Sequence, residues 1–425
     1  MIDKAIVKMW GTKIGEIKLL EDGYCSFKYD KNFVKSGIEV SPLRMPLSDN
    51  TYVFRDMPLN TFAGLPGLFY DSFPDKFGNS IIDEWLSRNG KSMDDFGPID
   101  KLLYIGKRSM GALEYYPVKK IETVTNVDVD RMVELCNQIL AEKEKINIKD
   151  SEMSNLIKIG TSAGGARAKA IVAYNKTLNS FKSGQIDAGD GYDYYIIKFD
   201  GVKNKDKDKL DSIFATRIEY AYYLMAKIAN INISDSSLLI RDDKYHFMTK
   251  RFDRYKENGK LMKRHMQSLC AIGHIPFNET RIFSYEATAQ LMKRINVPAS
   301  DIEELFKRMV FNVCFINHDD HVKNISFIMD RVGKWRISPF YDVTYMYDPN
   351  GKWTNEHQML INGKSKNINL VDIFTAGKNM DIKEIRMNKI MDDIRRAMSQ
   401  FPKIGKEAHL PDEVIEELKN KFIKL

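Results

Sequence analysis

The stretch FINHDDHVKN, residues 315–324, decides how the chain is interpreted, because it puts charged and amide side chains between two apolar segments. Apolar residues at helical spacing lead into it over 299–317, and the strand-like ISFIM follows at 325–329. Such polar residues are costly near a core unless they are paired or functional. The stretch taken alone is either a catalytic loop or a solvated turn, so its surroundings must distinguish the two.

A hairpin directly after this stretch favours the catalytic loop. Residues 325–329 and 334–338 predict two strands around the turn Asp330-Arg331-Val332-Gly333, and a hairpin brings its two open ends together. Asn324 precedes the first strand, and Asp342 follows the second. We therefore expect Asn324 and Asp342 to converge, with Asp319 one turn upstream. Carboxylate and amide oxygens suit Mg²⁺, with substrate phosphates completing its coordination.

Phosphoryl transfer also needs backbone N–H groups around the phosphates, and residues 161–169 (TSAGGARAK) are the candidate. The paired glycines let the backbone approach an anion closely. We expect four residues of this loop to bind the nucleotide, namely Ser162, Ala163, Gly164 and Gly165. A glycine pair by itself is equally consistent with an ordinary turn.

A cation and a nucleoside pocket complete the set. Lys198 lies inside the strand-like YYIIKFD, where a lysine is costly unless paired, and Glu219 in the next helix is its expected partner. The alternative is a lysine on an edge strand. The segment MTKRFDR (248–254) resembles an interlobe hinge, in which Lys250 and Phe252 bind the nucleotide and Asp253 accepts bonds from ribose hydroxyls. The alternative is a structural ion pair of Asp253 with its neighbouring arginines.

The composition sets wider bounds. The chain has 425 residues, of which 43% are apolar, so it can bury a sizeable core and is not expected to be disordered. The net charge of +7 suits an enzyme that handles phosphates, but it is too weak to indicate direct nucleic-acid binding. The four cysteines form no CxxC pair, which argues against zinc and disulfides. With no long apolar run, we expect a cytoplasmic protein and no membrane partner.

The order of elements predicts an α+β protein with two lobes, similar to a protein kinase, with a mixed α/β N-terminal half and an all-α C-terminal half. We expect an N-terminal subdomain over 1–120, a kinase N-lobe over 121–252 and a helical C-lobe over 253–425. The candidate parts occur in the order of a kinase: glycine loop, strand lysine, helix glutamate, hinge, catalytic aspartate with asparagine, and metal-binding aspartate. Further elements are expected as strands at 168–174 and 194–199, a hairpin over 239–249, and helices at 128–147, 210–230, 284–295, 382–400 and 411–424.

At these residues the sequence resembles the HipA family of Ser/Thr kinase toxins from bacterial toxin–antitoxin systems. The resemblance rests on the segments SAGGARAK (162–169), IK (197–198), KRFDR (250–254), DDHVKN (319–324), PFYD (339–342) and MLINGK (359–364). Residues 11–15, 62–74 and 105–112 are similar to the family's first subdomain. The catalytic-loop signature is specific, because DxHxKN differs from the HRDxxxxN of ordinary eukaryotic kinases. One departure is Ala168, where the family often has proline.

The resemblance implies roles for individual residues, with ATP and Mg²⁺ as cofactors. Asp319 would be the catalytic base, and its preference over the adjacent Asp320 rests on the resemblance only. The other implied roles are Asn324 and Asp342 as Mg²⁺ ligands, Lys198 on the α- and β-phosphates, Asp253 on ribose, and Ser162 as an autophosphorylation site that inactivates the enzyme. Lys323 is expected to contact the γ-phosphate, and His321 to be a structural hydrogen-bonding group rather than a proton shuttle.

The resemblance also implies partners. These are a HipB-like helix-turn-helix antitoxin, operator DNA reached through that antitoxin, and a protein substrate, which in the best-known members is an aminoacyl-tRNA synthetase. Three alternatives stay open from the residues. The first is a small-molecule or lipid phosphotransferase, and the second is a non-catalytic, kinase-like corepressor that scaffolds an antitoxin on DNA. The third is an unrelated α/β domain with a chance acidic loop, which the ordered set of motifs disfavours.

Overall fold

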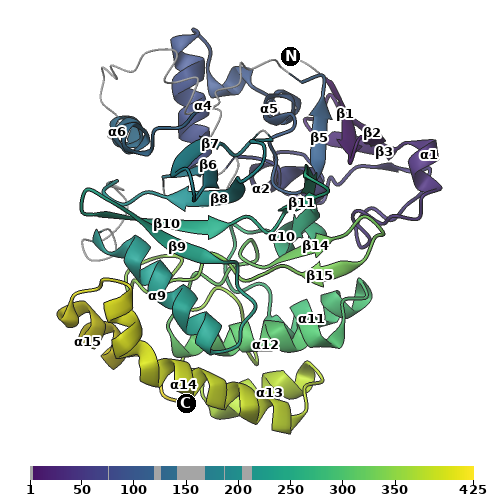
Figure 1. Ribbon diagram of the computed structural model, residues 1–425. Helices are drawn as coiled ribbons and strands as arrows, with labels where there is room; N and C mark the ends of the chain where they lie inside the picture. The colour runs from purple at the N-terminus through teal and green to yellow at the C-terminus, as the bar shows by residue number, and fades with distance from the viewer. Residues whose placement is uncertain (1–2, 75, 119–125, 141–167, 186, 203–212) are drawn as a thin grey trace. The chain divides into compact units, whose positions relative to one another are not determined.

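The computed structural model describes residues 3–74, 76–118, 126–140, 168–185, 187–202 and 213–425 (Figure 1). The chain forms two compact units. Unit 1 comprises Met1–Val40, Met45–Thr216 and Ser237–Met266, and unit 2 comprises Ser41–Arg44, Arg217–Ser236 and Gln267–Leu425. The predicted segment boundaries at 120 and 252 both fall within unit 1, and that three-part division stays a prediction.

The first sheet of unit 1 is antiparallel and has the strand order β4-β3-β2-β1-β5. Its side chains alternate between core and surface, as in β1, where Ala5, Val7 and Met9 are buried. Strands β2 and β3 pair antiparallel as a hairpin around residues 21–23. The strands are β1 (Lys4–Met9), β2 (Thr12–Leu19), β3 (Cys25–Tyr29), β4 (Thr51–Tyr52) and β5 (Leu113–Tyr116).

The second sheet of unit 1 has the order β7-β6-β8-β10-β9 (Figure 1). Residues of β6 and β8 such as Val172 and Ile197 are fully buried, and they pack with apolar side chains of α4 and α6 such as Ile82 and Cys136. This cluster is the core that fixes the position of β8. The strands are β6 (Lys169–Asn175), β7 (Ser180–Ser183), β8 (Asp193–Lys198), β9 (Ser236–Arg241) and β10 (Lys244–Lys250).

Helices and a small hairpin complete unit 1. The helices are α1 (Lys31–Val34), α2 (Leu59–Phe62), α3 (Gly67–Tyr70), α4 (Lys76–Arg88), the 3₁₀ turn η1 (Met93–Asp95), α5 (Pro98–Ile105) and α6 (Val129–Leu140), and the hairpin is β11 (Arg254–Glu257) with β12 (Lys260–Lys263). Helix α5 illustrates how proline and glycine determine where a helix begins and ends. Pro98 occupies its first position, and Gly106, with φ of 57°, ends it.

Unit 2 is mainly helical, with one small sheet. Its helices are most of α9 (Ala215–Ile228), α10 (Leu269–Gly273), α11 (Tyr285–Arg294), α12 (Ala299–Cys314), α13 (Leu370–Asn379), α14 (Glu384–Glu407) and α15 (Asp412–Lys421). Its sheet contains β14 (Ser326–Met329), β15 (Trp335–Ile337) and the last two residues of β13 (His265–Ser268). Helix α12 is the central element, because Leu305, Phe306 and Phe311 on it are fully buried. The sheet corrects the expectation of an all-α C-terminal half, since β13 adds a strand to the predicted hairpin.

The helices of the described residues include none that is long and apolar enough to cross a membrane. Two of the helix starts agree with the sequence, since α12 and α15 begin directly after Pro298 and Pro411. Helix α11 begins after Ser284, whose side chain accepts a hydrogen bond from the backbone N–H of Ala287.

Three histidines are expected to make the fold acid-sensitive. Burial lowers the pKa of His265 to about 4, of His274 to about 3 and of His318 to about 4, from an ordinary value near 6.5. The fold holds them neutral, whereas the unfolded chain takes up protons below pH ~6.5, so stability is complete above that pH and falls as the pH drops toward 4. The loss is up to about 1.4 kcal/mol per pH unit for each histidine.

Thermal melting at pH 7.5 and pH 5.0 measures this loss. The variant His265→Gln should reduce the pH-dependent decrease in melting temperature, while the matched variant His409→Gln, at an exposed histidine, should leave it unchanged. If the melting temperature decreases equally from pH 7.5 to pH 5.0 in wild type and both variants, His265 does not contribute to the acid sensitivity of the fold.

Candidate active site

The polar stretch 315–324 is a partly buried, hydrogen-bonded loop between α12 and β14. The backbone N–H of Asn317 donates to the carbonyl of Asn312 at 2.9 Å, and that of His318 donates to the carbonyl of Met346 at 3.0 Å. Asn317 and Asp320 are only 2% and 3% exposed. A solvated turn would leave these groups in water, so the structure favours the alternative in which the loop is a constructed site.

The two adjacent aspartates of the loop have different environments. Both carboxylate oxygens of Asp320 contact neighbouring polar groups. Oδ2 accepts a hydrogen bond from the Tyr285 hydroxyl at 3.0 Å and lies 3.0 Å from His357 Nδ1. Oδ1 accepts a hydrogen bond from the Gln358 N–H at 2.8 Å. Asp319 is 31% exposed, and its Oδ1 accepts one bond, from Gln358 Nε2 at 2.8 Å. Among the described residues, Asp319 Oδ2 has no hydrogen-bond donor. Asp319 is thus the aspartate with a carboxylate oxygen available to a substrate.

Asn324 and Asp342 line one small cavity in unit 2, of about 10 Å³, to which Asn317, Asp320 and Tyr341 also contribute. The amide Nδ2 of Asn324 donates to the backbone carbonyl of Asp319 at 2.8 Å, which leaves the amide oxygen as the ligand atom. Asp342 has φ of 54°, a left-handed conformation that is uncommon for residues other than glycine and that is often associated with function. Asn324 and Asp342 therefore line the same cavity, and their roles as Mg²⁺ ligands stay predictions.

The donor set fits a hard divalent ion that is bound together with phosphate. One carboxylate and one amide oxygen are few ligands, and no group of three or more His, Cys, Asp or Glu side chains that could hold a metal occurs among the described residues. Mg²⁺ commonly takes one or two protein carboxylates and completes its shell with phosphate oxygens and water. Asn324 and Asp342 could supply the protein oxygens for such an ion, and Mg²⁺ as a cofactor stays a prediction.

His321 and Lys323 are both fixed inside the loop. His321 Nδ1 accepts from the backbone N–H of Lys323 at 3.1 Å, and its Nε2 lies 3.8 Å from Asp319 Oδ1. The Lys323 ammonium lies 4.0 Å from the ring centroid of Phe277. Its backbone carbonyl accepts from the Tyr341 hydroxyl at 2.7 Å. The bonded Nδ1 and the long distance to Asp319 agree with a structural role for His321, which stays a prediction, as does the contact of Lys323 with a γ-phosphate.

Lys198 lies on a central strand of unit 1, because β8 is flanked by β6 and β10. This placement excludes the alternative of a lysine on an edge strand. The lysine is 8% exposed, and its ammonium lies 6.0 Å from the Phe247 ring centroid. Glu219 is 2% exposed on α9 and belongs to unit 2. The pairing of Lys198 with Glu219 stays a prediction.

The structure places Asp253 in a buried ion cluster of unit 1. Its carboxylate accepts from Arg251 at 2.9 and 2.7 Å, from Arg254 at 2.7 Å and from the N–H of Gly111 at 2.7 Å. Burial alone would raise the pKa of Asp253, but the two guanidinium groups hold it well below its usual range. The structural ion pair that the sequence left open is therefore present, and the contact with ribose stays a prediction.

Two further hinge residues lie on the surface or its margin. The Lys250 ammonium pairs with the Asp193 carboxylate at 2.9 Å and is 40% exposed. The carbonyl of Phe252 accepts from the Arg264 guanidinium at 3.0 Å. Neither contact involves a nucleotide-binding feature, so these two predictions stay untested. The glycine-loop residues Ser162, Ala163, Gly164 and Gly165 lie outside the described residues.

The sequence did not predict a role for the segment that carries His357 and Gln358. Both side chains contact the catalytic-loop aspartates, although Gln358 is 39 positions away from Asp319. The neighbouring run MLINGK (359–364) contributes to the family resemblance but predicts no role for Gln358. Pairing of Gln358 with Asp319 requires the fold of the whole of residues 325–357, so local spacing could not have revealed it.

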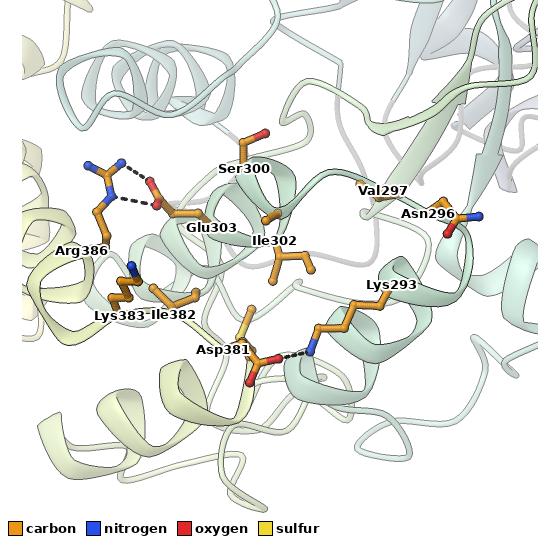
Figure 2. Close-up of a pocket in the computed structure, with 12 residues that line it drawn as sticks. Lys293, Asn296, Val297, Ser300, Ile302, Glu303, Asp381, Ile382, Lys383 and Arg386 are labelled. Carbon is orange, nitrogen blue, oxygen red and sulfur yellow. Dashed lines mark hydrogen bonds and ion pairs between the residues drawn. The ribbon is translucent and has the colours of Figure 1, made fainter.

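A larger pocket of unit 2 lies away from the Asp319 loop. It has a volume of about 640 Å³ and is lined by the end of α11, the start of α12 and residues 380–386 (Figure 2). Four of its charged side chains form two ion pairs, Lys293 with Asp381 and Arg386 with Glu303. It includes no predicted site residue, so a search for volume alone would miss the Asp319 loop.

Comparison with known proteins agrees with this fold. HipA of Shewanella oneidensis MR-1, solved in complex with HipB and its operator DNA, aligns with a TM-score of 0.69 at 17% identity, over 98% of this chain and 95% of its own. This likeness confirms the α+β, HipA-like fold. A Sinorhizobium fredii protein named "Putative kinase Y4mE" is 31% identical over 104 residues, which are 23% of this chain and 24% of that protein. The match thus spans about a quarter of the length of this relative.

Family models cover most of the chain. The model of the HipA N-terminal domain matches residues 5–116, and that of the HipA-like C-terminal domain matches residues 161–401. The second match includes Lys198, Asp319, Asn324 and Asp342, and by itself covers more than half of the sequence. The chain belongs to the HipA family.

Proposed function

We propose that this chain is a kinase that transfers the γ-phosphate of ATP, with Mg²⁺, to a Ser or Thr hydroxyl of a protein. The observation that carries the proposal is the arrangement in unit 2. Asn324 and Asp342 line one cavity, and the Asn324 amide holds the backbone of Asp319, whose carboxylate is partly exposed. A general base beside an oxygen-only ligand pair is the arrangement that phosphoryl transfer requires.

Each residue has a definite task in this reaction. Asp319 orients the acceptor hydroxyl and takes its proton as the oxygen forms a bond to the γ-phosphorus and the bond to ADP breaks. Asn324 and Asp342 would hold Mg²⁺ through their side-chain oxygen atoms. When bound, Mg²⁺ neutralises charge on the β- and γ-phosphates. Lys198, on the central strand β8 of unit 1, stays the lysine that we expect to bind the phosphates.

An assay with the full chain alone tests this function. The protein is incubated with ATP labelled at the γ-phosphate, with Mg²⁺ and no other substrate, and we expect Mg²⁺-dependent label on the protein, at Ser162. Label on Ser162 favours a protein kinase over a small-molecule phosphotransferase. Failure to bind Mg²⁺·ATP in calorimetry would contradict the proposal and favour a non-catalytic corepressor.

We also propose that the chain acts as the toxin of a HipBA-like system. The support is its membership of the HipA family and the complex of the Shewanella HipA with HipB and operator DNA. By this account a HipB-like helix-turn-helix antitoxin binds the chain and brings it to DNA. Phosphorylation of Ser162 would add like charge beside the nucleotide and lower activity.

A further inference from the structure

A glutamine holds the carboxylate of the proposed base. Gln358 Nε2 donates to Asp319 Oδ1 at 2.8 Å, and the Gln358 side chain belongs to a residue only 6% exposed. His321 Nε2 approaches the same oxygen, at 3.8 Å. Both groups therefore lie on the Oδ1 side of the carboxylate, which leaves Oδ2 as the oxygen that can face an acceptor hydroxyl.

The backbone of Gln358 is held by hydrogen bonds at both its N–H and its carbonyl. Its N–H donates to Asp320 Oδ1 at 2.8 Å, and its carbonyl accepts from the N–H of Arg281 at 2.8 Å. The preceding His357 places Nδ1 3.0 Å from Asp320 Oδ2. A buried side chain on a backbone held at both ends has restricted freedom, which favours one position for the Nε2 donor.

A chain of buried polar groups supports the contact between Gln358 and Asp319. The Tyr285 hydroxyl on α11 donates to Asp320 Oδ2 at 3.0 Å and accepts from Asn312 Nδ2 on α12 at 3.0 Å. Asn317 Nδ2 in turn donates to Asn312 Oδ1 at 2.9 Å. Helices α11 and α12 and the catalytic loop are therefore linked by hydrogen bonds to the buried Asp320. Because Asp320 also accepts from the Gln358 N–H, this network helps to hold Gln358 in place.

We propose that Gln358 is a positioning residue that fixes the orientation of the Asp319 carboxylate and assigns proton acceptance to Oδ2. The inference rests on the proposed function, because it requires that Asp319 receives a proton. Gln358 does not touch the reacting atoms. It acts through Asp319, and its loss should slow the chemical step without changing nucleotide binding.

The test compares Gln358→Met with wild type and with Gln400→Met, a control at an exposed glutamine on α14. Methionine preserves length and volume but donates no hydrogen bond. The readout is incorporation of label from γ-labelled Mg²⁺·ATP into the chain. We expect the rate constant for labelling of the chain at saturating ATP, written kcat here, to fall by about 10²-fold in Gln358→Met. The KM for ATP and the melting temperature should stay at the wild-type values, and the control should match wild type.

A second variant guards against misfolding. Gln358→Glu keeps the shape and the backbone contacts but opposes Asp319 Oδ1 with a second carboxylate, so its kcat should fall at least as far. Wild-type kcat in Gln358→Met, a higher KM, or losses that follow the melting temperature in both variants would overturn the positioning role while leaving the kinase function standing. A wild-type protein that incorporates no label and binds no Mg²⁺·ATP would overturn both.

Discussion

Replacement of Asp319 by asparagine is expected to lower phosphate incorporation by about 10³-fold, the size of effect that loss of a general base produces. Asparagine keeps the shape of the side chain, and its amide oxygen can still accept from Gln358 Nε2. It cannot take a proton at the position of Oδ2. The melting temperature should therefore stay at the wild-type value, and label transfer from ATP measures the loss.

The adjacent Asp320→Asn variant is the matched control, because it should affect stability. Asparagine cannot satisfy all the donors that now surround the Asp320 carboxylate, which include Tyr285 and His357. A buried donor without a partner costs about 1–3 kcal/mol, so the melting temperature should fall. A fully stable but inactive Asp320→Asn, beside an active Asp319→Asn, would transfer the role of base to Asp320.

Replacement of Asp342 by asparagine is the second large expected effect. Asparagine tolerates the left-handed backbone at this position, where φ is 54°, so the fold should be kept while one negative charge near the ion is lost. We expect activity to fall by at least about 10²-fold, with partial recovery at high Mg²⁺ concentration, because electrostatic stabilisation of the transferred phosphate weakens.

Activity measured against Mg²⁺ concentration tests this. The control is Asp392→Asn, at an exposed aspartate on α14 that is paired only with Arg395 among the described contacts, and it should behave as wild type. An Asp342→Asn variant whose Mg²⁺ dependence matches wild type would show that Asp342 is not a ligand.

The sequence predicted the geometry of the loop because that geometry depends on a short hairpin. Strands β14 and β15 pair antiparallel with Phe327 opposite Ile337, so their open ends return together and bring Asn324 near Asp342. The choice between Asp319 and Asp320 required the structure. Both have the same local sequence context, and only the distant partners Tyr285, His357 and Gln358 make one of them structural.

Local signals failed where packing overrides them. The sequence predicts a helix over 382–400, two residues short of Pro402, and a proline inside a helix removes a backbone hydrogen bond. Helix α14 instead continues past Pro402 to Glu407. Phe401 and Ile404, which flank the proline, are buried, and their packing favours the longer helix. Gly405 lets α15 approach closely, as a Cβ there would lie 2.5 Å from the Ile415 side chain. This tertiary contact offsets the cost of the proline.

A structure of the full chain with Mn²⁺ and a non-hydrolysable ATP analogue tests the central claim most directly, because the anomalous signal of Mn²⁺ locates the ion. Our account predicts a peak within coordination distance of both the Asn324 amide oxygen and the Asp342 carboxylate, with Asp319 facing the γ-phosphate but not binding the ion. An ion bound elsewhere, or a nucleotide bound away from the 315–324 loop, would contradict it.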